Sequence, residues 1–438
     1  MYPHYLKSCA KKFYAISDFL FKRAFNNSPI MSGLMKNCMN NHPVNIHHTF
    51  LGILPSYFAR KVRSQVRELF VATAILDLAT AMVMIFEPIY LYRQGYGLRG
   101  VMLFYLGVYV LYFFLMPLGA KFAKNKGFEK SIFIGTVFQV VLYGALLAIQ
   151  YFPSAVIIAV FCYALQKTFF WPGYHADFAW YGQKDEWGKE IGNMIVISSV
   201  VYIIGPFLGG LILALSGFTI LFVVVSVLIL MSNIPLLITR EQFEPSEFSY
   251  WRAYRRLFRA ENRRKFISYI GFGEELIVLT VWPIFIYLAV QDNLFSVGGL
   301  IALSTLATSV AVLYIGRLTD ESSRHRDSTL RAGSLLYSFV WVLRTVLQGP
   351  LGVFLLDTGS RVCKSIVAVP MMAITYNQAQ KTSIMKSVVF FEMSLVMGKI
   401  SAILLVLVLI SLHGQNAWSL IFMLAAVYSL LYATLQTK

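Results

Sequence analysis

The chain contains a succession of apolar runs of roughly 20 residues, the length at which a helix crosses the hydrocarbon core of a bilayer. Hydrophobic residues make up 58% of its 438 residues and charged residues only 13%, whereas a soluble protein has about 25% charged residues. We therefore predict an all-α integral membrane protein with twelve transmembrane helices, at approximately 69–93, 98–119, 131–150, 154–176, 190–213, 217–237, 267–290, 294–314, 331–348, 351–376, 385–412 and 416–435.

The net charge of +17 would suit a nucleic-acid partner, but the placement of the basic residues argues against one. With the amino terminus placed in the cytoplasm, Lys and Arg gather in the inward-facing segments, and only Arg93 and Arg99 fall in outward-facing ones. This is the positive-inside pattern. It predicts a multi-pass protein of the plasma or inner membrane with both termini cytoplasmic, in which the basic residues contribute at most an attraction to anionic lipid.

The predicted spans divide the chain into four parts. Residues 1–66 form a basic cytoplasmic extension, residues 67–238 and 266–438 hold six spans each, and residues 239–265 form the central cytoplasmic loop. In that loop, the segment from Trp251 to Arg259 has the pattern of a basic amphipathic helix at the inner membrane surface.

The extension leaves two readings open. Its segment Lys7–Phe25 mixes aromatic residues with Lys and could form a surface helix, or the whole stretch is incidental and translation begins further along. His42, His47 and His48 have no carboxylate or cysteine nearby at ligand spacing, so we expect no metal site and no cofactor.

The ends of the second and eighth spans carry related segments, which supports the division into two halves. Gly119 and Lys124 occupy the first copy, and Gly316 and Asp320 the second, whereas Ala123 stands where the first copy would have its Asp. We expect the glycines to allow tight turns. Together with the six-plus-six arrangement, these segments resemble the major facilitator superfamily over residues 69–436, and the resemblance implies a twelve-helix secondary transporter with its substrate site between the halves.

A second motif lies in the fifth span. Gly205-Pro206-Phe-Leu-Gly209-Gly210 is similar to the fifth-helix motif associated with antiporters and exporters of that family, although Ile197 and Val201 replace its upstream glycines. Pro206 is expected to kink the helix, and the glycines to let a neighbouring helix approach closely. Ordinary helix packing is the alternative explanation for these residues.

Ionisable residues occur inside several spans, where charge is costly and usually faces a partner, a cavity or a transport pathway. In the tenth span Asp357, Arg361 and Lys364 follow one another at i, i+4 and i+7, so a helix places all three on one face. With Lys167 in the fourth span and Lys399 in the eleventh, they are our candidates for substrate contact or the pathway. The resemblance implies that spans one, four, seven and ten line the central cavity.

Proton coupling needs a carboxylate whose pKa is raised into the working range by burial or by a like-charged neighbour. Our candidates, which all lie within predicted spans, are Asp77, Glu274, Glu275 and Glu392. Glu274 and Glu275 project about 100° apart on a helix, so we expect at most one to face the cavity.

The alternative to a transport role is mutual pairing of the buried charges. Asp357 and Arg361 could form an i, i+4 bridge, and Glu392 could neutralise Lys364. Glu87 and Arg344, near the outer ends of their spans, are expected to reach toward the membrane surface.

Three classes of function follow. The first is a monomeric secondary transporter that moves a small solute by alternating access, with proton-coupled efflux expected and uptake as the alternative. The sequence shows no nucleotide-binding Gly-rich loop, so we do not expect ATP to drive transport directly. A membrane enzyme built on His175 and Asp177 is disfavoured, because neither has a His or Cys partner at ligand spacing. A non-transporting scaffold or sensor is left open by Ala123 and the extension.

Overall fold

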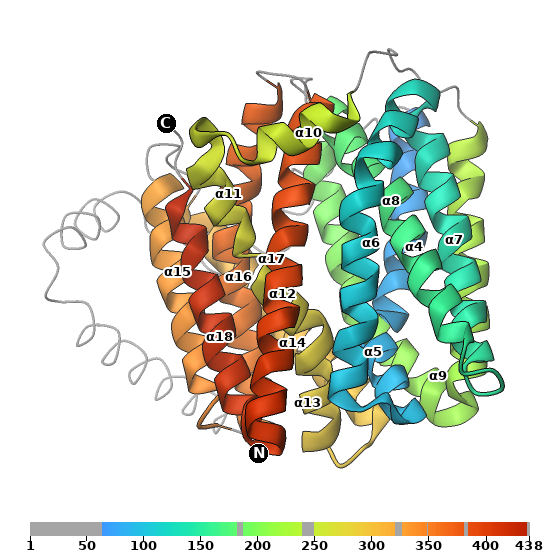
Figure 1. Cartoon of the computed structure of the whole chain (residues 1–438), viewed down its shortest axis with the longest axis vertical. Coiled ribbons are helices and arrows are strands. Elements are labelled where there is room, and N and C mark those ends of the chain that lie inside the picture. The colour runs from blue at the N-terminus through green and yellow to red at the C-terminus, as the bar shows by residue number, and fades with distance from the viewer. Residues whose placement is uncertain are drawn as a thin grey trace, which may run out of the picture. The chain divides into compact units, whose positions relative to one another are not determined.

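The computed structural model describes residues 64–181, 187–238, 249–319, 326–347, 349–380 and 384–435. They belong to one compact unit, Ala59–Lys438, which is described here by itself. Throughout these ranges every regular element is a helix (Figure 1), as the apolar runs predicted. The histidines of the extension and Asp320 of the second loop motif lie outside the described residues.

The first predicted span comprises α4 (Ser64–Val83) and α5 (Phe86–Leu91), followed by a π-helical turn at Tyr92–Tyr96. The backbone then reverses at Gly95 and Gly97, whose φ angles of 89° and 59° favour glycine. The remaining helices of this half are α6 (Gly97–Lys126), α7 (Phe128–Ala148), α8 (Ala155–Tyr181) and α9 (Trp187–Ile238).

Two of these helices differ from the expected spans. The helix α6 continues past Gly119 to Lys126, and the turn into α7 consists of Gly127 alone, with a φ of 111°. The helix α9 contains two predicted spans, and its non-helical residue is Gly217 (φ 75°) rather than Pro206. The kink expected at Pro206 stays a prediction, while the predicted boundary between the fifth and sixth spans coincides with Gly217.

The short α10 (Tyr250–Leu257) leads into the second half. Its first span is interrupted: α11 (Arg263–Ile270), α12 (Gly273–Leu276) and α13 (Trp282–Ala289) follow one another, with a π-helical turn at Ile277–Val281. The remaining helices are α14 (Leu294–Thr319), α15 (Arg326–Leu343), α16 (Pro350–Gln380), α17 (Ile384–His413) and α18 (Ala417–Leu431).

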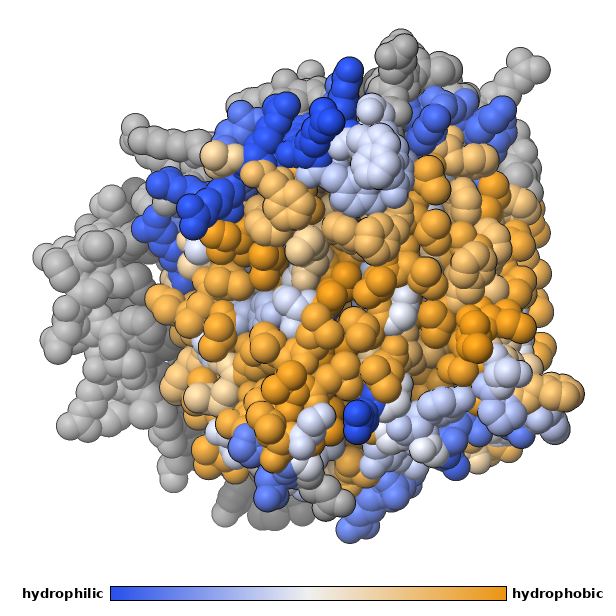
Figure 2. All heavy atoms as spheres, viewed as in Figure 1, coloured by the Kyte–Doolittle hydropathy of each residue, from blue (hydrophilic) through white to orange (hydrophobic). Residues whose placement is uncertain are grey.

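The surface of the unit has the polarity of a membrane protein. On the face that Figure 2 shows, an apolar belt crosses the middle, with hydrophilic residues gathered at both ends. Among the described residues, eight helical segments are long and apolar enough to cross a membrane, and two of them, Val71–Lys126 and Ser198–Ile234, run through the glycine turns just described. A multi-pass membrane protein is thus confirmed, while the count of twelve spans stays a prediction.

Helices α4–α9, which we call the N-terminal helices, lie together on one side, and α15–α18 lie on the other (Figure 1). We call α11–α18 the C-terminal helices. The groups meet mainly where α6 packs against α17 and α9 packs against α14, and also where α8 contacts α17 and α5 contacts α13. Residues at these contacts therefore touch helices of both groups.

The fifth-span glycines have a clear packing role. A Cβ on Gly209 would lie 2.0 Å from the carbonyl oxygen of Met82 in α4, and one on Gly298 of α14 would lie 2.3 Å from the carbonyl oxygen of Pro206. Gly210 meets Gly298 on the same side. The close helix approach predicted from this motif is confirmed. In this region α9 packs closely against α4 on one side and against α14 on the other.

Gly119 also acts in packing rather than in a turn. It lies inside α6, where a Cβ would come within 1.9 Å of the carbonyl oxygen of Thr168 in α8. Gly316 likewise falls within a helix, α14. The predicted tight turns at these glycines are wrong, since any side chain on Gly119 would force α6 and α8 apart.

Candidate functional site

A pair of adjacent glutamates lies where the seventh span is interrupted. Gly273 and Gly398 bring this segment against α17 and α18: a Cβ on Gly273 would lie 2.7 Å from the carbonyl oxygen of Gly398, and one on Gly398 would lie 2.3 Å from that of Ile270. This close contact places Glu274 and Glu275 among the C-terminal helices, where each finds a different partner.

Glu274 is completely buried within the C-terminal helices. Its Oε2 accepts hydrogen bonds from Lys364 Nζ at 2.8 Å and from the Tyr432 hydroxyl at 2.7 Å, while the Tyr337 hydroxyl donates to Oε1. Lys364 Nζ also donates to the Tyr432 hydroxyl at 2.7 Å. Lys364 is thus neutralised by Glu274, and its predicted pairing with Glu392 is wrong.

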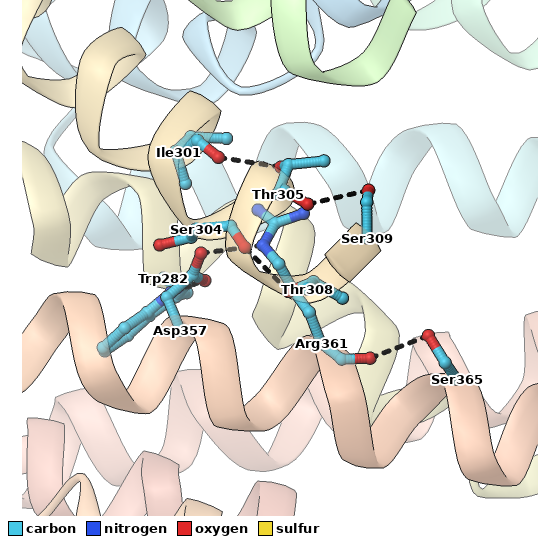
Figure 3. A network of polar contacts seen from close by, with 9 residues as sticks. All are labelled: Trp282, Ile301, Ser304, Thr305, Thr308, Ser309, Asp357, Arg361 and Ser365. Carbon is cyan, nitrogen blue, oxygen red and sulfur yellow. Dashed lines mark hydrogen bonds and ion pairs between the residues drawn. The ribbon is translucent and has the colours of Figure 1, made fainter. Parts of the chain in front are cut away.

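Asp357 and Arg361 form the i, i+4 bridge expected from the sequence. Arg361 Nε donates to Asp357 Oδ2 at 2.7 Å, and Trp282 Nε1 of α13 donates to Asp357 Oδ1 at 2.9 Å. Figure 3 shows this cluster beside the polar side chains of α14. The Arg361 side chain is 33% exposed and Asp357 is buried, so the arginine is the accessible member of the pair.

Glu275 is paired with Lys399 across the contact between α12 and α17. The distance from Lys399 Nζ to Glu275 Oε2 is 2.7 Å. The Glu275 side chain is 31% exposed, whereas that of Lys399 is 10% exposed. Unlike the fully enclosed Glu274, this ion-paired carboxylate is therefore only partly buried.

The Lys399 ammonium also approaches the N-terminal helices. It lies 5.4 Å from the ring centroid of Tyr109 in α6, and the ammonium of Lys167 in α8 lies 5.5 Å from the same ring. Lys167 further lies 4.3 Å from the ring centroid of Tyr163. We call the group Tyr109, Lys167, Lys399 and Glu275 the Tyr109 site. It brings one cation from each group of helices to a single aromatic ring.

The charges of the Tyr109 site do not cancel. Lys399 has Glu275 as its ion-pair partner, whereas Lys167 lies over tyrosine rings and is attracted to Glu87 and Glu275 from further away. The carboxylate of Glu275 is attracted to both lysines and to Lys364. The four residues of the site thus include two lysines and one carboxylate, so an anionic group could neutralise the second lysine in competition with the more distant Glu87 and Glu392.

Glu392 joins the two groups of helices at a neighbouring point. It is buried in α17, where the Tyr112 hydroxyl of α6 donates to its Oε2 at 2.8 Å and His175 Nε2 of α8 lies 3.0 Å from its Oε1. The His175 ring stacks on Trp171. His175 thus contacts Glu392, one of the proton-coupling candidates. The side chain of Asp177 is not among those that the structure describes.

Asp77 stands apart from these clusters. It belongs to α4 and accepts a hydrogen bond from the Ser198 hydroxyl of α9 at 2.7 Å. The structure therefore brings together Lys167, Glu275 and Lys399, links Asp357 to Arg361 and Glu274 to Lys364, and leaves Asp77 within the N-terminal helices.

Two charged residues that were expected to reach the membrane surface are instead buried. The Tyr143 and Tyr163 hydroxyls each donate to Glu87 at 3.0 Å, and Tyr163 is also the ring beneath Lys167. The guanidinium carbon of Arg344 lies 3.8 Å from the ring centroid of Trp282 and 3.9 Å from that of Trp341.

Both predictions of surface reach are wrong, because aromatic partners inside the bundle hold these charges. Treating every ionisable residue in a span as a site candidate would have found Glu87.

Comparison with known proteins places this geometry in context. Residues 69–274 match the family model described as Major Facilitator Superfamily. A solved structure titled as a proton dependent oligopeptide (POT) family transporter shares the fold, with a TM-score of 0.64, 12% sequence identity, and coverage of 84% of this chain and 99% of that chain. No curated protein matches the sequence.

Proposed function

We propose that this chain, whose residues 69–274 match the Major Facilitator Superfamily model, carries a small anionic or zwitterionic solute across the membrane in a proton-coupled cycle. Secondary transport follows from the family. The proton coupling and the solute class are our proposal, and the observation that carries them is the Tyr109 site. There, Lys167 and Lys399 converge on one ring, and the partly buried Glu275 neutralises one of them.

The proposed cycle starts from the Glu275–Lys399 ion pair. An anionic solute that approaches Lys399 competes with Glu275 for the ammonium, and the weakened ion pair lets Glu275 take up a proton, which frees Lys399 for the solute carboxylate or phosphate. The anionic group then binds between Lys399 and Lys167, which belong to different groups of helices. Its attraction to both lysines draws the groups together around the solute, and release of the proton from Glu275 restores the original pair and expels the anion.

The solute panel follows from this chemistry. The solved relative is named for proton-dependent oligopeptide transport, and peptides carry the carboxylate that two converging ammonium groups would bind. Dipeptides, amino acids, dicarboxylates and phosphate monoesters are therefore the first compounds to test. Lipophilic drug cations form the comparison set, because the excess positive charge of the site should reject them.

The direction of transport is a further part of the proposal. The sequence favours export by antiport through its Gly205–Gly210 motif, but the packing of these glycines on α4 and α14 gives them a role that importers need equally. Uptake by symport is therefore the second candidate. The distinction is whether the solute and the proton move in opposite directions or together.

The test is proton movement in liposomes that contain the purified protein and trapped pyranine, a pH-sensitive dye. Addition of a transported solute outside should acidify the interior in symport and alkalinise it in antiport. Glu275→Gln should abolish this proton signal while exchange of labelled solute continues, and Glu261→Gln, at an exposed carboxylate, is the matched control. Proton signals of equal size in wild type and Glu275→Gln would refute the role of Glu275. Absence of flux for the whole panel would favour the scaffold alternative.

A further inference from the structure

The segment that links the two groups of helices exposes a row of arginines. The exposed ones in α10 and the residues just after it are Arg252, Arg255, Arg259, Arg263 and Arg264. Glu261 is the acidic residue among them, and its distance of 3.4 Å from Arg259 belongs to an ion pair in which both side chains are more than 60% exposed. Such an exposed pair contributes little, and Glu261 can offset the charge of at most one of these arginines.

Two large aromatic side chains accompany the arginines. Trp251 is 72% exposed and Phe258 is 69% exposed. Trp is enriched where a membrane protein meets the lipid headgroups, and a helix that exposes aromatic and basic residues together typically lies in that interface. We call Trp251, Phe258 and the five exposed arginines the α10 surface.

The opposite face of α10 is fastened to α6 at a proline. Pro117 has no N–H to donate to the carbonyl oxygen of Phe113, four residues earlier in the helix. The Tyr254 hydroxyl lies 3.1 Å from this oxygen, and the Tyr250 hydroxyl donates to the Phe114 carbonyl at 3.0 Å. The carbonyl oxygen that Pro117 leaves without a helical partner is thus one of the two acceptors that hold α10.

This attachment sets the orientation of α10. Leu257 is buried on the attached side, and α10 also packs against α17. Figure 1 shows α10 running across the end of the helices, and Figure 2 shows a strongly hydrophilic cap there, directly next to the apolar belt. The α10 surface therefore lies at the level where lipid headgroups meet the protein.

We propose that the α10 surface binds anionic phospholipid headgroups of the membrane, with Trp251 and Phe258 entering the interface and the exposed arginines contacting the phosphates. Arginine suits this role because its planar guanidinium binds phosphate through two parallel hydrogen bonds. Because α10 is fastened to α6 and packs on α17, bound lipid would steady the contact between the N-terminal and C-terminal helices. The binding itself does not depend on the proposed transport function.

The test measures phospholipid binding to the full chain by native mass spectrometry. Phosphatidylglycerol should bind at least about tenfold more tightly than phosphatidylcholine, and Arg252→Gln/Arg255→Gln/Arg259→Gln should lose that preference, since each arginine near an anionic surface contributes roughly fivefold. The matched control, Lys121→Gln/Lys126→Gln/Lys130→Gln, removes three exposed charges from α6 and α7 and should keep it. Equal preference in both triple variants would overturn the proposal.

A second measurement does not need the triple variant to fold. Brominated phosphatidylglycerol should quench tryptophan fluorescence more strongly in wild type than in Trp251→Phe, and brominated phosphatidylcholine should show a smaller difference. Quenching that is unchanged by Trp251→Phe would contradict the proposal. Displacement of the lipid by short RNA, with tighter binding of the RNA, would assign the α10 surface to a soluble polyanion and overturn it as well.

Discussion

The N-terminal and C-terminal helices stabilise buried charge in different ways. In the C-terminal helices three carboxylates have a Lys or Arg partner: Glu274 with Lys364, Glu275 with Lys399, and Asp357 with Arg361. In the N-terminal helices, Glu87 is held by two tyrosine hydroxyls and Asp77 by a serine hydroxyl, while Lys167 rests on tyrosine rings.

This difference assigns separate tasks to the two groups. A buried ion pair depends strongly on the protonation of its carboxylate, because loss of one charge leaves the other without its partner. A carboxylate held by hydroxyl groups can become neutral and still accept hydrogen bonds. We therefore expect the C-terminal helices to respond to protons, and the N-terminal helices to supply a cation whose charge is constantly available.

The largest effect should come from removing one member of an enclosed pair. Lys364→Met leaves the fully buried Glu274 without its counter-charge, and breaking a buried pair in this way costs about 3–5 kcal/mol. Thermal unfolding in detergent should reveal the loss. Lys364→Met/Glu274→Gln should recover part of it, and a double variant that is no more stable than the single one would show that pairing is not what Lys364 provides.

A smaller loss should follow from overfilling the contact between α6 and α8. Gly119→Ala would place a Cβ 1.9 Å from the Thr168 carbonyl oxygen, and overpacking of this kind costs roughly 1–3 kcal/mol. Gly144→Ala in α7 is the control, since no atom lies within 4 Å of its added Cβ. The two variants are compared by unfolding temperature, and equal temperatures would mean that α6 and α8 separate without cost.

Neutralising Glu87 should have a modest effect and thereby sharpen the contrast between the two groups of helices. Glu87→Gln keeps a carbonyl oxygen for one tyrosine hydroxyl, so the loss in stability should be about 1 kcal/mol, against a larger loss for Glu274→Gln, where Lys364 would become unpaired. Unfolding of both variants under the same conditions checks this order. A greater loss for Glu87→Gln would remove the distinction between hydroxyl-held and cation-held carboxylates.

The smallest effect is expected at Asp77, which has one side-chain hydrogen bond to Ser198. Asp77→Asn should change stability by less than about 1 kcal/mol and should leave solute-driven proton movement intact. Its proton signal is measured beside that of Glu275→Gln. Loss of the signal in Asp77→Asn alone would move the coupling carboxylate from the C-terminal to the N-terminal helices.

Local sequence relations predicted the structure well. Apolar runs located the helices, the boundary at Gly217 lies where the fifth and sixth predicted spans meet, and the Asp357–Arg361 bridge follows from i, i+4 spacing on one helix. These features depend on neighbouring residues, whose relative positions are set once a helix forms.

Relations between distant helices were not accessible in the same way. Lys364 and Glu274 are 90 residues apart, and their pairing depends on how α12 and α16 are rotated about their axes. The burial of Arg344 between two Trp rings depends on the same packing. The sequence indicated that Glu275, Lys167 and Lys399 would matter, but their convergence on Tyr109 required the three-dimensional arrangement.

The central claim is that protonation of Glu275 frees Lys399 to bind an anionic solute. The most direct measurement is the thermal stabilisation produced by a transported carboxylate at pH 6 and at pH 8, in wild type and in Glu275→Gln. A ligand at 100 times its Kd stabilises by roughly 2.7 kcal/mol, which such a measurement detects. The account predicts stronger stabilisation of wild type at pH 6 than at pH 8, and equally strong stabilisation of Glu275→Gln at both. A Glu275→Gln variant that keeps the pH dependence of wild type would contradict it.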